Sequence, residues 1–209
     1  MARVLESIGK GLLKKNGISV PDFAIADTPE RACKAADEVG YPVVLKALVA
    51  VGKRGKAGAV KFAGNEEETQ QIAIEILKMK VHNFPVERLL VEKKLDIEQE
   101  LYVSVTYDSS QRKPVIIASS KGGVDIEEIA NMYPNKIIKT PVDPIKGLYR
   151  YQAKEIAKAL GLNGKELQQA SAVIWQLYQV FERYDATILE INPLAITSDG
   201  EMAAAAILM

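Results

Sequence analysis

The stretch whose residue types most suggest chemistry is Pro42–Lys61, PVVLKALVAVGKRGKAGAVK. Val43, Val44 and Leu45 are apolar or β-branched and predict a strand, which a proline can open. Lys46 follows inside an apolar run. Its ammonium must stay in water or find a partner, because burying an uncompensated charge is costly.

The loop after this strand combines small residues with cations. Residues 52–59 hold three glycines, two alanines and the cations Lys53, Arg54 and Lys56. Small residues let the backbone approach a ligand closely, and amides beside cations suit a phosphate chain. The loop is therefore either a hairpin lid over phosphates or a surface hairpin with solvated lysines, since such motifs have many false positives. It is neither a Walker loop nor a dinucleotide fingerprint, because both spacings are absent.

A second candidate site lies in the predicted strand 187–196, TILEINPLAI. Glu190 and Asn192 are two apart, so strand alternation places both side chains on one face. A carboxylate and an amide oxygen are hard ligands suited to Mg²⁺. The alternative is a pair of polar residues on the solvent face of an edge strand, which Pro193 favours.

The elements that must position these residues follow from periodicity and turn signals. Thr28 is the predicted N-cap of a helix that begins at Pro29 or Glu30 and ends before Gly40. Apolar spacing predicts helices over residues 3–16, 30–39, 65–79, 151–160 and 163–184. Strands are expected over residues 23–26, 43–46, 60–62, 86–93, 98–107, 114–119, 137–140, 187–196 and 201–209, with turns at 108–112 and 198–200.

Composition restricts the function classes. The 209 residues suffice for one large domain or two lobes, and a formal net charge of zero provides no basic field for nucleic acid or an anionic membrane. One cysteine, Cys33, excludes an internal disulfide and fits a cytoplasmic setting. The single histidine, His82, disfavours a histidine-based catalytic or metal site and is expected at the surface. No signal peptide or membrane-length apolar run is present, so no membrane partner is expected.

The order of these motifs resembles the nucleotide-binding, ATP-grasp half of the succinyl-CoA synthetase β family, a half that malate–CoA ligase and ATP-citrate lyase also contain. The matching stretches cover most of the chain: VVLK (43–46), GKRGKAGAVK (52–61), LLVEKKLDIEQELYVSV (89–105), SSKGGVDIEEIA (119–130), DPIKGLYRYQAKEIAKALGL (143–162) and LEINPLAIT (189–197). The resemblance implies an α/β (α+β) ATP-grasp fold of two lobes with nucleotide between them. We expect a lid lobe over residues 21–105 and a base lobe of residues 1–20 with 106–209.

The resemblance also implies a role for each matching residue. Lys46 would contact the phosphates, and the loop residues Lys53, Arg54 and Gly55 would cover them. The backbone of Val91 and Glu92, with Leu95, would meet the base, and Glu100 would accept from the ribose. Asn192 would be a Mg²⁺ ligand, and Glu190 would face a phosphohistidine of a partner α subunit.

The implied activity is that of an acid–thiol ligase component. Such enzymes join an acid to CoA, as in the tricarboxylic acid cycle, with Mg²⁺ and ATP (GTP is possible) as cofactors. The phosphoryl group passes through a histidine on the α subunit, which also carries the CoA site. His82 matches no phosphohistidine motif, and the chain alone is expected to be inactive.

Three departures from the family pattern qualify this expectation. The opening L-x-E-Y-Q-x-K is VLESIGK here, and the position of a second metal-ligating aspartate is Ala206. The C-terminal CoA-ligase domain is expected to be absent, and the apolar ending EMAAAAILM suggests a piece of a longer polypeptide. A non-catalytic nucleotide-binding protein or sensor is therefore the alternative, and a nucleic-acid module using the basic loop is a third hypothesis that zero net charge disfavours.

Overall fold

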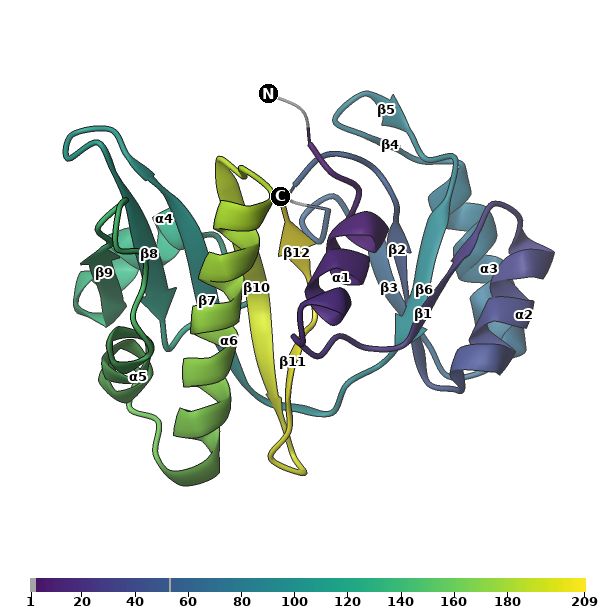
Figure 1. Cartoon of the computed structure of the whole chain (residues 1–209). Coiled ribbons are helices and arrows are strands. Elements are labelled where there is room, and N and C mark those ends of the chain that lie inside the picture. The colour runs from purple at the N-terminus through teal and green to yellow at the C-terminus, as the bar shows by residue number, and fades with distance from the viewer. Residues whose placement is uncertain (1–2, 53) are drawn as a thin grey trace. The chain divides into compact units, whose positions relative to one another are not determined.

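The computed structural model describes residues 3–52 and 54–209, and the described chain divides into two compact units (Figure 1). Unit 1 contains the described residues up to Ile8 together with Pro21–Leu95, and unit 2 contains Gly9–Val20 with Asp96–Met209. Both combine helices with antiparallel sheets, which confirms the predicted mixed fold class. The expected lid lobe ends at residue 105, which falls inside a strand of unit 2. In the structure, unit 1 ends at Leu95, ten residues earlier.

Unit 1 is a four-stranded sheet in the order β1-β6-β2-β3. Its strands are β1 (Phe23–Ala26), β2 (Val43–Ala47), β3 (Val60–Ala63) and β6 (Leu89–Lys93). Two neighbouring helices, α2 (Pro29–Val39) and α3 (Glu66–Leu77), pack with it, and a small hairpin is formed by β4 (Lys80–Val81) and β5 (Phe84–Pro85) (Figure 1). His82 lies exposed in that hairpin's turn with a φ of 48°, as the surface prediction requires.

Both helices of unit 1 begin at capping residues. Thr28 accepts a hydrogen bond from the Arg31 amide at 3.2 Å, and Pro29 is the first helical residue of α2. Asn65 accepts from the Glu68 amide at 2.9 Å and so caps α3. Buried apolar residues of both helices pack in one hydrophobic core with Leu45 of β2. Cys33 of α2 is also buried, with 6% of its surface exposed.

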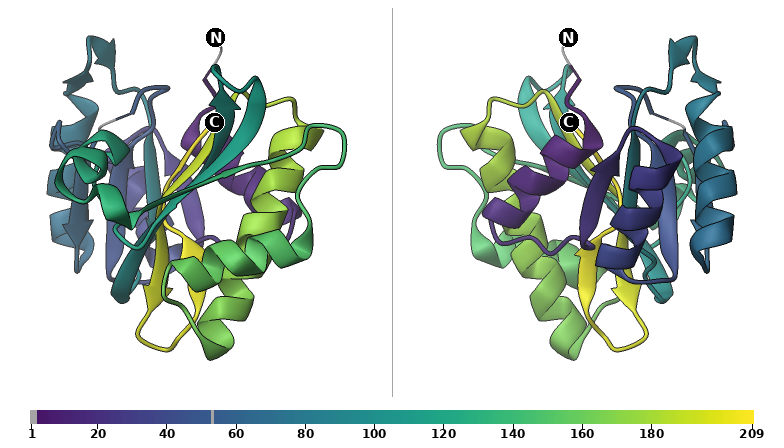
Figure 2. Two further views of the ribbon diagram at one scale, coloured as in Figure 1. Left: turned by 90° about the vertical axis from the view of Figure 1, so that its left-hand side faces the viewer. Right: turned by 90° about the vertical axis from the view of Figure 1, so that its right-hand side faces the viewer.

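Unit 2 is built on a longer sheet in the order β11-β10-β7-β8-β9, with β12 also pairing with β10. Its strands are β7 (Ile97–Asp108), β8 (Lys113–Ser119), β9 (Ile137–Pro141), β10 (Ile188–Thr197), β11 (Met202–Ala204) and β12 (Ile207–Leu208). Its helices are α4 (Ile126–Met132), the short η1 (Pro134–Lys136), α5 (Arg150–Ala159) and α6 (Gly164–Arg183), and α1 (Glu6–Lys15) contributes most of its length. Helices α5 and α6 lie side by side (Figure 2).

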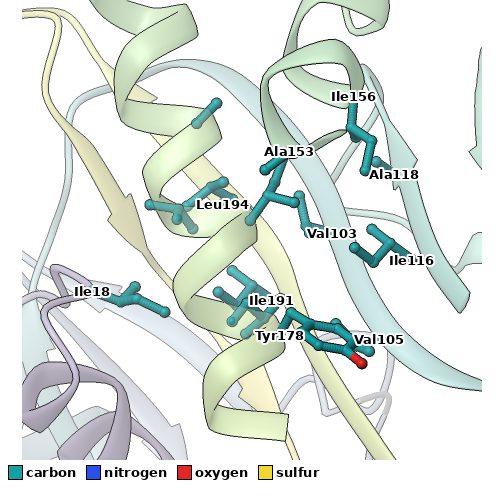
Figure 3. Close-up of a cluster of buried hydrophobic side chains, with 14 of the residues drawn as sticks. Ile18, Val103, Val105, Ile116, Ala118, Ala153, Ile156, Tyr178, Ile191 and Leu194 are labelled. Atoms are coloured by element: carbon teal, nitrogen blue, oxygen red, sulfur yellow. The ribbon is translucent and has the colours of Figure 1, made fainter. Parts of the chain in front are cut away.

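Alternation along the strands separates a core face from a polar face. Val103 and Val105 of β7 and Ile191 of β10 enter a core with Tyr178 of α6 (Figure 3). The intervening residues of β7 and β10, which include Glu190, therefore point to the opposite face. The buried stripe of α6 matches the spacing that predicted this helix.

Two predictions about the C-terminal strands were wrong. Strand β10 is an inner strand with β7 on one side and β11 and β12 on the other, so the edge-strand interpretation of Glu190 and Asn192 fails. Residues 201–209 do not form one continuous strand but two short ones separated by Ala205 and Ala206. The break lies opposite Pro193, which has no N–H to offer the ladder. Within the described residues, none of the helices has the length and apolar character needed to cross a membrane.

Candidate functional site

Lys46 is buried in unit 1 between two carboxylates. It lies on β2 with 7% of its surface exposed, and its Nζ is 3.4 Å from Glu6 Oε1 and forms an ion pair with Glu92 Oε1. Burial acts to lower the pKa of Lys46, but Glu6 and Glu92 outweigh it, so the pKa lies above its ordinary value. The ammonium therefore stays charged and paired. The sequence predicts that it is either in water or paired, because an uncompensated buried charge is costly.

The glycine-rich loop is folded back onto the same cluster through Arg54. Its Nη1 donates to the Ala47 carbonyl at 3.1 Å, and its Nη2 forms an ion pair with Glu6 Oε2. The loop is closed by bonds from the Gly58 amide to the Gly55 carbonyl and from the Ala59 amide to the Arg54 carbonyl, each 3.0 Å long. A Cβ at Gly55 would meet nothing within 4 Å. Lys53, expected beside the phosphates, lies outside the described residues.

The residues expected at the base are at the end of β6. This strand has β1 and β2 as neighbours, so the backbones of Val91 and Glu92 lie within the sheet. Pairing continues to Lys94, whose amide donates to the Pro42 carbonyl at 3.0 Å, and the half-buried Leu95 follows. The side chain of Glu92 faces Lys46, a role that sequence reasoning did not assign.

Glu190 lies on the polar face of unit 2 and is half-buried. Tyr102 donates from its hydroxyl to Glu190 Oε2 at 3.0 Å. Burial raises the pKa of the Glu190 carboxyl, although hydrogen bonds from Tyr102 and Asn192 oppose the shift. Burial and the Glu190 charge raise the pKa of Tyr102 as well, so its hydroxyl remains a donor.

Asn192 fastens β10 to a glycine turn. Its Oδ1 accepts from the Gly123 amide at 2.8 Å, and its Nδ2 donates to the Val124 carbonyl at 2.9 Å. Gly123 has a φ of 74°, and a Cβ there would lie 2.0 Å from Glu100 Oε2. Asn192, the turn and Glu100 are thus contiguous, so the expected metal ligand and the expected ribose acceptor share one neighbourhood.

Ala206 lies directly across from Asn192. The Asn192 amide donates to the Ala206 carbonyl at 3.1 Å, and the neighbouring rung pairs Ile191 with Ile207. Opposed residues of an antiparallel pair place their side chains on one face, roughly 5 Å apart at Cβ. An aspartate at position 206 would therefore stand beside the Asn192 amide, where the alanine methyl offers no ligand atom.

The Asn192 side chain offers one oxygen of the kind that Mg²⁺ binds. Among the described residues there is no group of three or more His, Cys, Asp or Glu side chains that could hold a metal ion. Asn192 Oδ1 keeps a second lone pair beside its bond to Gly123. Because Mg²⁺ usually takes one or two protein oxygens and completes its shell with phosphates and water, Asn192 could supply one such oxygen.

The opening helix contributes two buried side chains with ionisable groups that the sequence did not mark as functional. Glu6 is 3% exposed, and Lys10, at 0% exposure, donates to the Ala205 carbonyl at 2.7 Å. These are the Glu and Lys that VLESIGK retains from the family's opening pattern. Their i, i+4 spacing on a helix was the available signal. Nothing local in the sequence indicated that the two would be buried.

Comparison with known proteins finds one family model, several relatives and several solved structures that resemble this chain. The model of the ATP-grasp domain matches residues 3–196. The β subunit of ADP-forming succinate–CoA ligase from Ignicoccus hospitalis is 44% identical over 200 residues, which are 96% of this chain and 53% of that protein. The chain therefore spans about half the length of the curated relatives it matches.

Solved structures share the fold at low identity. The protein PH1788 from Pyrococcus horikoshii matches with a TM-score of 0.81 at 22% identity, covering 99% of this chain and 90% of that one. A dinucleotide-forming acetyl-coenzyme A synthetase from Ca. Korarchaeum cryptofilum, solved with coenzyme A and Ca-AMPCP, matches with a TM-score of 0.79 at 22% identity. It covers 99% of this chain and 92% of that one. At this level of identity the likeness supports the fold alone.

Proposed function

Because this chain belongs to the ATP-grasp family, we propose that it is the nucleotide-binding portion of an acid–CoA ligase of the succinyl-CoA synthetase β type. The observation that carries the proposal is the buried Lys46, paired with two carboxylates beside a glycine-rich loop, in a chain 44% identical to a succinate–CoA ligase β subunit. A paired cation next to loop amides is suited to neutralising charge during phosphoryl transfer.

The proposal gives each half of the chain a task. In unit 1, Lys46, Lys53, Arg54 and Gly55 bind the phosphates, while Val91, Glu92 and Leu95 meet the base. In unit 2, Glu100 accepts from the ribose and Asn192 holds the nucleotide's Mg²⁺. ATP is the proposed nucleotide, since the relatives are named ADP-forming.

The proposed partner is an α subunit that carries the phosphohistidine and the CoA site. Glu190 is proposed to face that histidine, because it is a carboxylate fixed by Tyr102 on the polar face of β10. Such a carboxylate can orient an imidazole and stabilise its charged form. A cytoplasmic location belongs to the same proposal and is supported by the one buried cysteine, Cys33, which is free.

A non-catalytic nucleotide-binding protein is the second candidate, and Ala206 is the observation that favours it. A phosphoryl-transfer assay separates the two. The chain is mixed with an α subunit of a succinate–CoA ligase and γ-labelled Mg-ATP, and label on the α-subunit histidine is measured. We expect transfer that Glu190→Gln reduces by at least about tenfold, or roughly 1.4 kcal/mol of barrier. Nucleotide binding with no transfer would favour the non-catalytic alternative.

A further inference from the structure

Glu6 contacts two of the cations expected at the phosphates, Lys46 and Arg54. It is the first residue of α1, and each of its carboxylate oxygens has a different cationic partner. Oε1 is 3.4 Å from Lys46 Nζ, and Oε2 forms an ion pair with Arg54 Nη2. The Glu6 carboxyl side chain is only 1% exposed, and those of Lys46 and Arg54 are 9% and 12% exposed.

Among the described residues, this cluster contains charges of both signs, and their pairing makes the burial tolerable. Lys46 and Arg54 bring two positive charges, and Glu6 and Glu92 bring two negative ones. A buried carboxylate is tolerated when it is paired and hydrogen-bonded, whereas removing its partner is strongly destabilising. Lys46 and Arg54 also repel each other, as the opposing effect of Arg54 on the Lys46 pKa indicates. A carboxylate that touches both cations offsets that repulsion.

The contact has a mechanical consequence for the loop. Arg54 is anchored at two points, to Glu6 and to the Ala47 carbonyl at the end of β2. Its own carbonyl accepts from the Ala59 amide, which closes the loop. Fixing Arg54 therefore fixes the start of the glycine-rich loop relative to the strand that carries Lys46.

We propose that Glu6 is a positioning residue for phosphate binding, which sets the spacing of Lys46 and Arg54 and holds the glycine-rich loop ready before a nucleotide arrives. Preorganised groups lose less conformational freedom when the ligand binds, so affinity improves without a new ligand contact. The inference deepens the proposed function, since it relies on Lys46 and Arg54 as the phosphate-binding cations. Its loop-ordering part holds whether or not nucleotide binds.

The first test measures amide hydrogen exchange in the nucleotide-free chain. Glu6→Gln keeps the size of the side chain and removes its charge, and Glu38→Gln removes an exposed carboxylate of α2 as the matched control. We expect the Gly58 and Ala59 amides to exchange at least about tenfold faster in Glu6→Gln and unchanged in Glu38→Gln. Should Glu6→Gln fail to fold, Arg54→Gln breaks the same contact from the loop side with the same expected result. Unchanged exchange at both amides would overturn the proposal.

The second test measures Mg-ATP affinity in a double-mutant cycle with Glu6→Gln, Arg54→Met and the double variant. A positioning role predicts that Glu6→Gln weakens binding about tenfold in the parent chain and much less when Arg54 is already gone. Equal effects in both backgrounds would indicate a general structural role and overturn the proposal. Tighter binding by Glu6→Gln would also overturn it, because Glu6 would then be a competing anion. A parent chain that binds no Mg-ATP would count against the proposed function, while the exchange result would still decide the role of Glu6.

Discussion

Lys46 occupies a strand position where an unpaired lysine would be very costly, and two acidic side chains make it stable. The apolar run around Lys46 predicted that the ammonium would be paired or solvated. It could not identify the partners, because Glu6 lies 40 residues earlier and Glu92 on another strand. Such ion pairs between residues far apart in the sequence depend on the tertiary structure, so the residues next to Lys46 in the sequence cannot predict them.

Replacing Lys46 should therefore cost stability as well as affinity. Lys46→Met leaves Glu6 and Glu92 buried with one cation fewer, at an expected cost of about 3–5 kcal/mol in unfolding free energy. Adding Glu92→Gln removes a buried negative charge that has lost its Lys46 partner and should recover part of that loss. Urea unfolding of the single and double variants measures both effects, and a double variant no more stable than Lys46→Met would refute this explanation.

The pH dependence of this contribution follows from the direction of the Lys46 shift. The pKa of Lys46 is raised above its ordinary value in the folded chain, so the folded state holds the proton more tightly. The stabilisation is complete below the unfolded-state pKa and is lost only as pH rises through the folded-state value. The difference between the parent chain and Lys46→Met should accordingly stay constant from neutral pH up to about 10 and shrink above it.

At the scale of elements, periodicity and caps predicted most of the fold. The N-cap at Thr28 and the stripe of α6 were correct because both depend on nearby residues. The β4–β5 hairpin was missed, since two-residue strands leave no periodic pattern. The inner position of β10 was also missed, because Pro193 suggested an edge and only the tertiary fold supplies the neighbour on each side.

The register between β10 and the C-terminal residues leads to a prediction about metal. Ala206→Asp would place a carboxylate opposite Asn192 on the same sheet face. We expect the apparent Mg²⁺ affinity, titrated at fixed ATP, to rise at least about tenfold, or roughly 1.4 kcal/mol. Gln111→Asp adds the same charge in the exposed β7–β8 turn and serves as the control. An unchanged affinity in Ala206→Asp would mean that position 206 is not a ligand position.

At the scale of the whole molecule, the chain is an ATP-grasp domain that covers about half of its relatives' length. The resemblance found in the sequence predicted this family correctly, because six motifs in family order are far more specific than one glycine loop. The contacts of the site residues could not be predicted in the same way. They depend on tertiary pairs such as Glu6 with Lys46 and Arg54, which a sequence motif does not specify.

The most direct test of the central claim is titration calorimetry of the chain with ATP and with GTP, each with and without Mg²⁺. We predict Mg²⁺-dependent ATP binding, weaker GTP binding, and a large loss of ATP affinity in Lys46→Met/Glu92→Gln but not in Lys61→Met, which removes one positive charge from β3 of the same unit. ATP binding that survives in Lys46→Met/Glu92→Gln would remove Lys46 from the site. No ATP binding in either the parent chain or Ala206→Asp would contradict the claim that this chain binds the nucleotide.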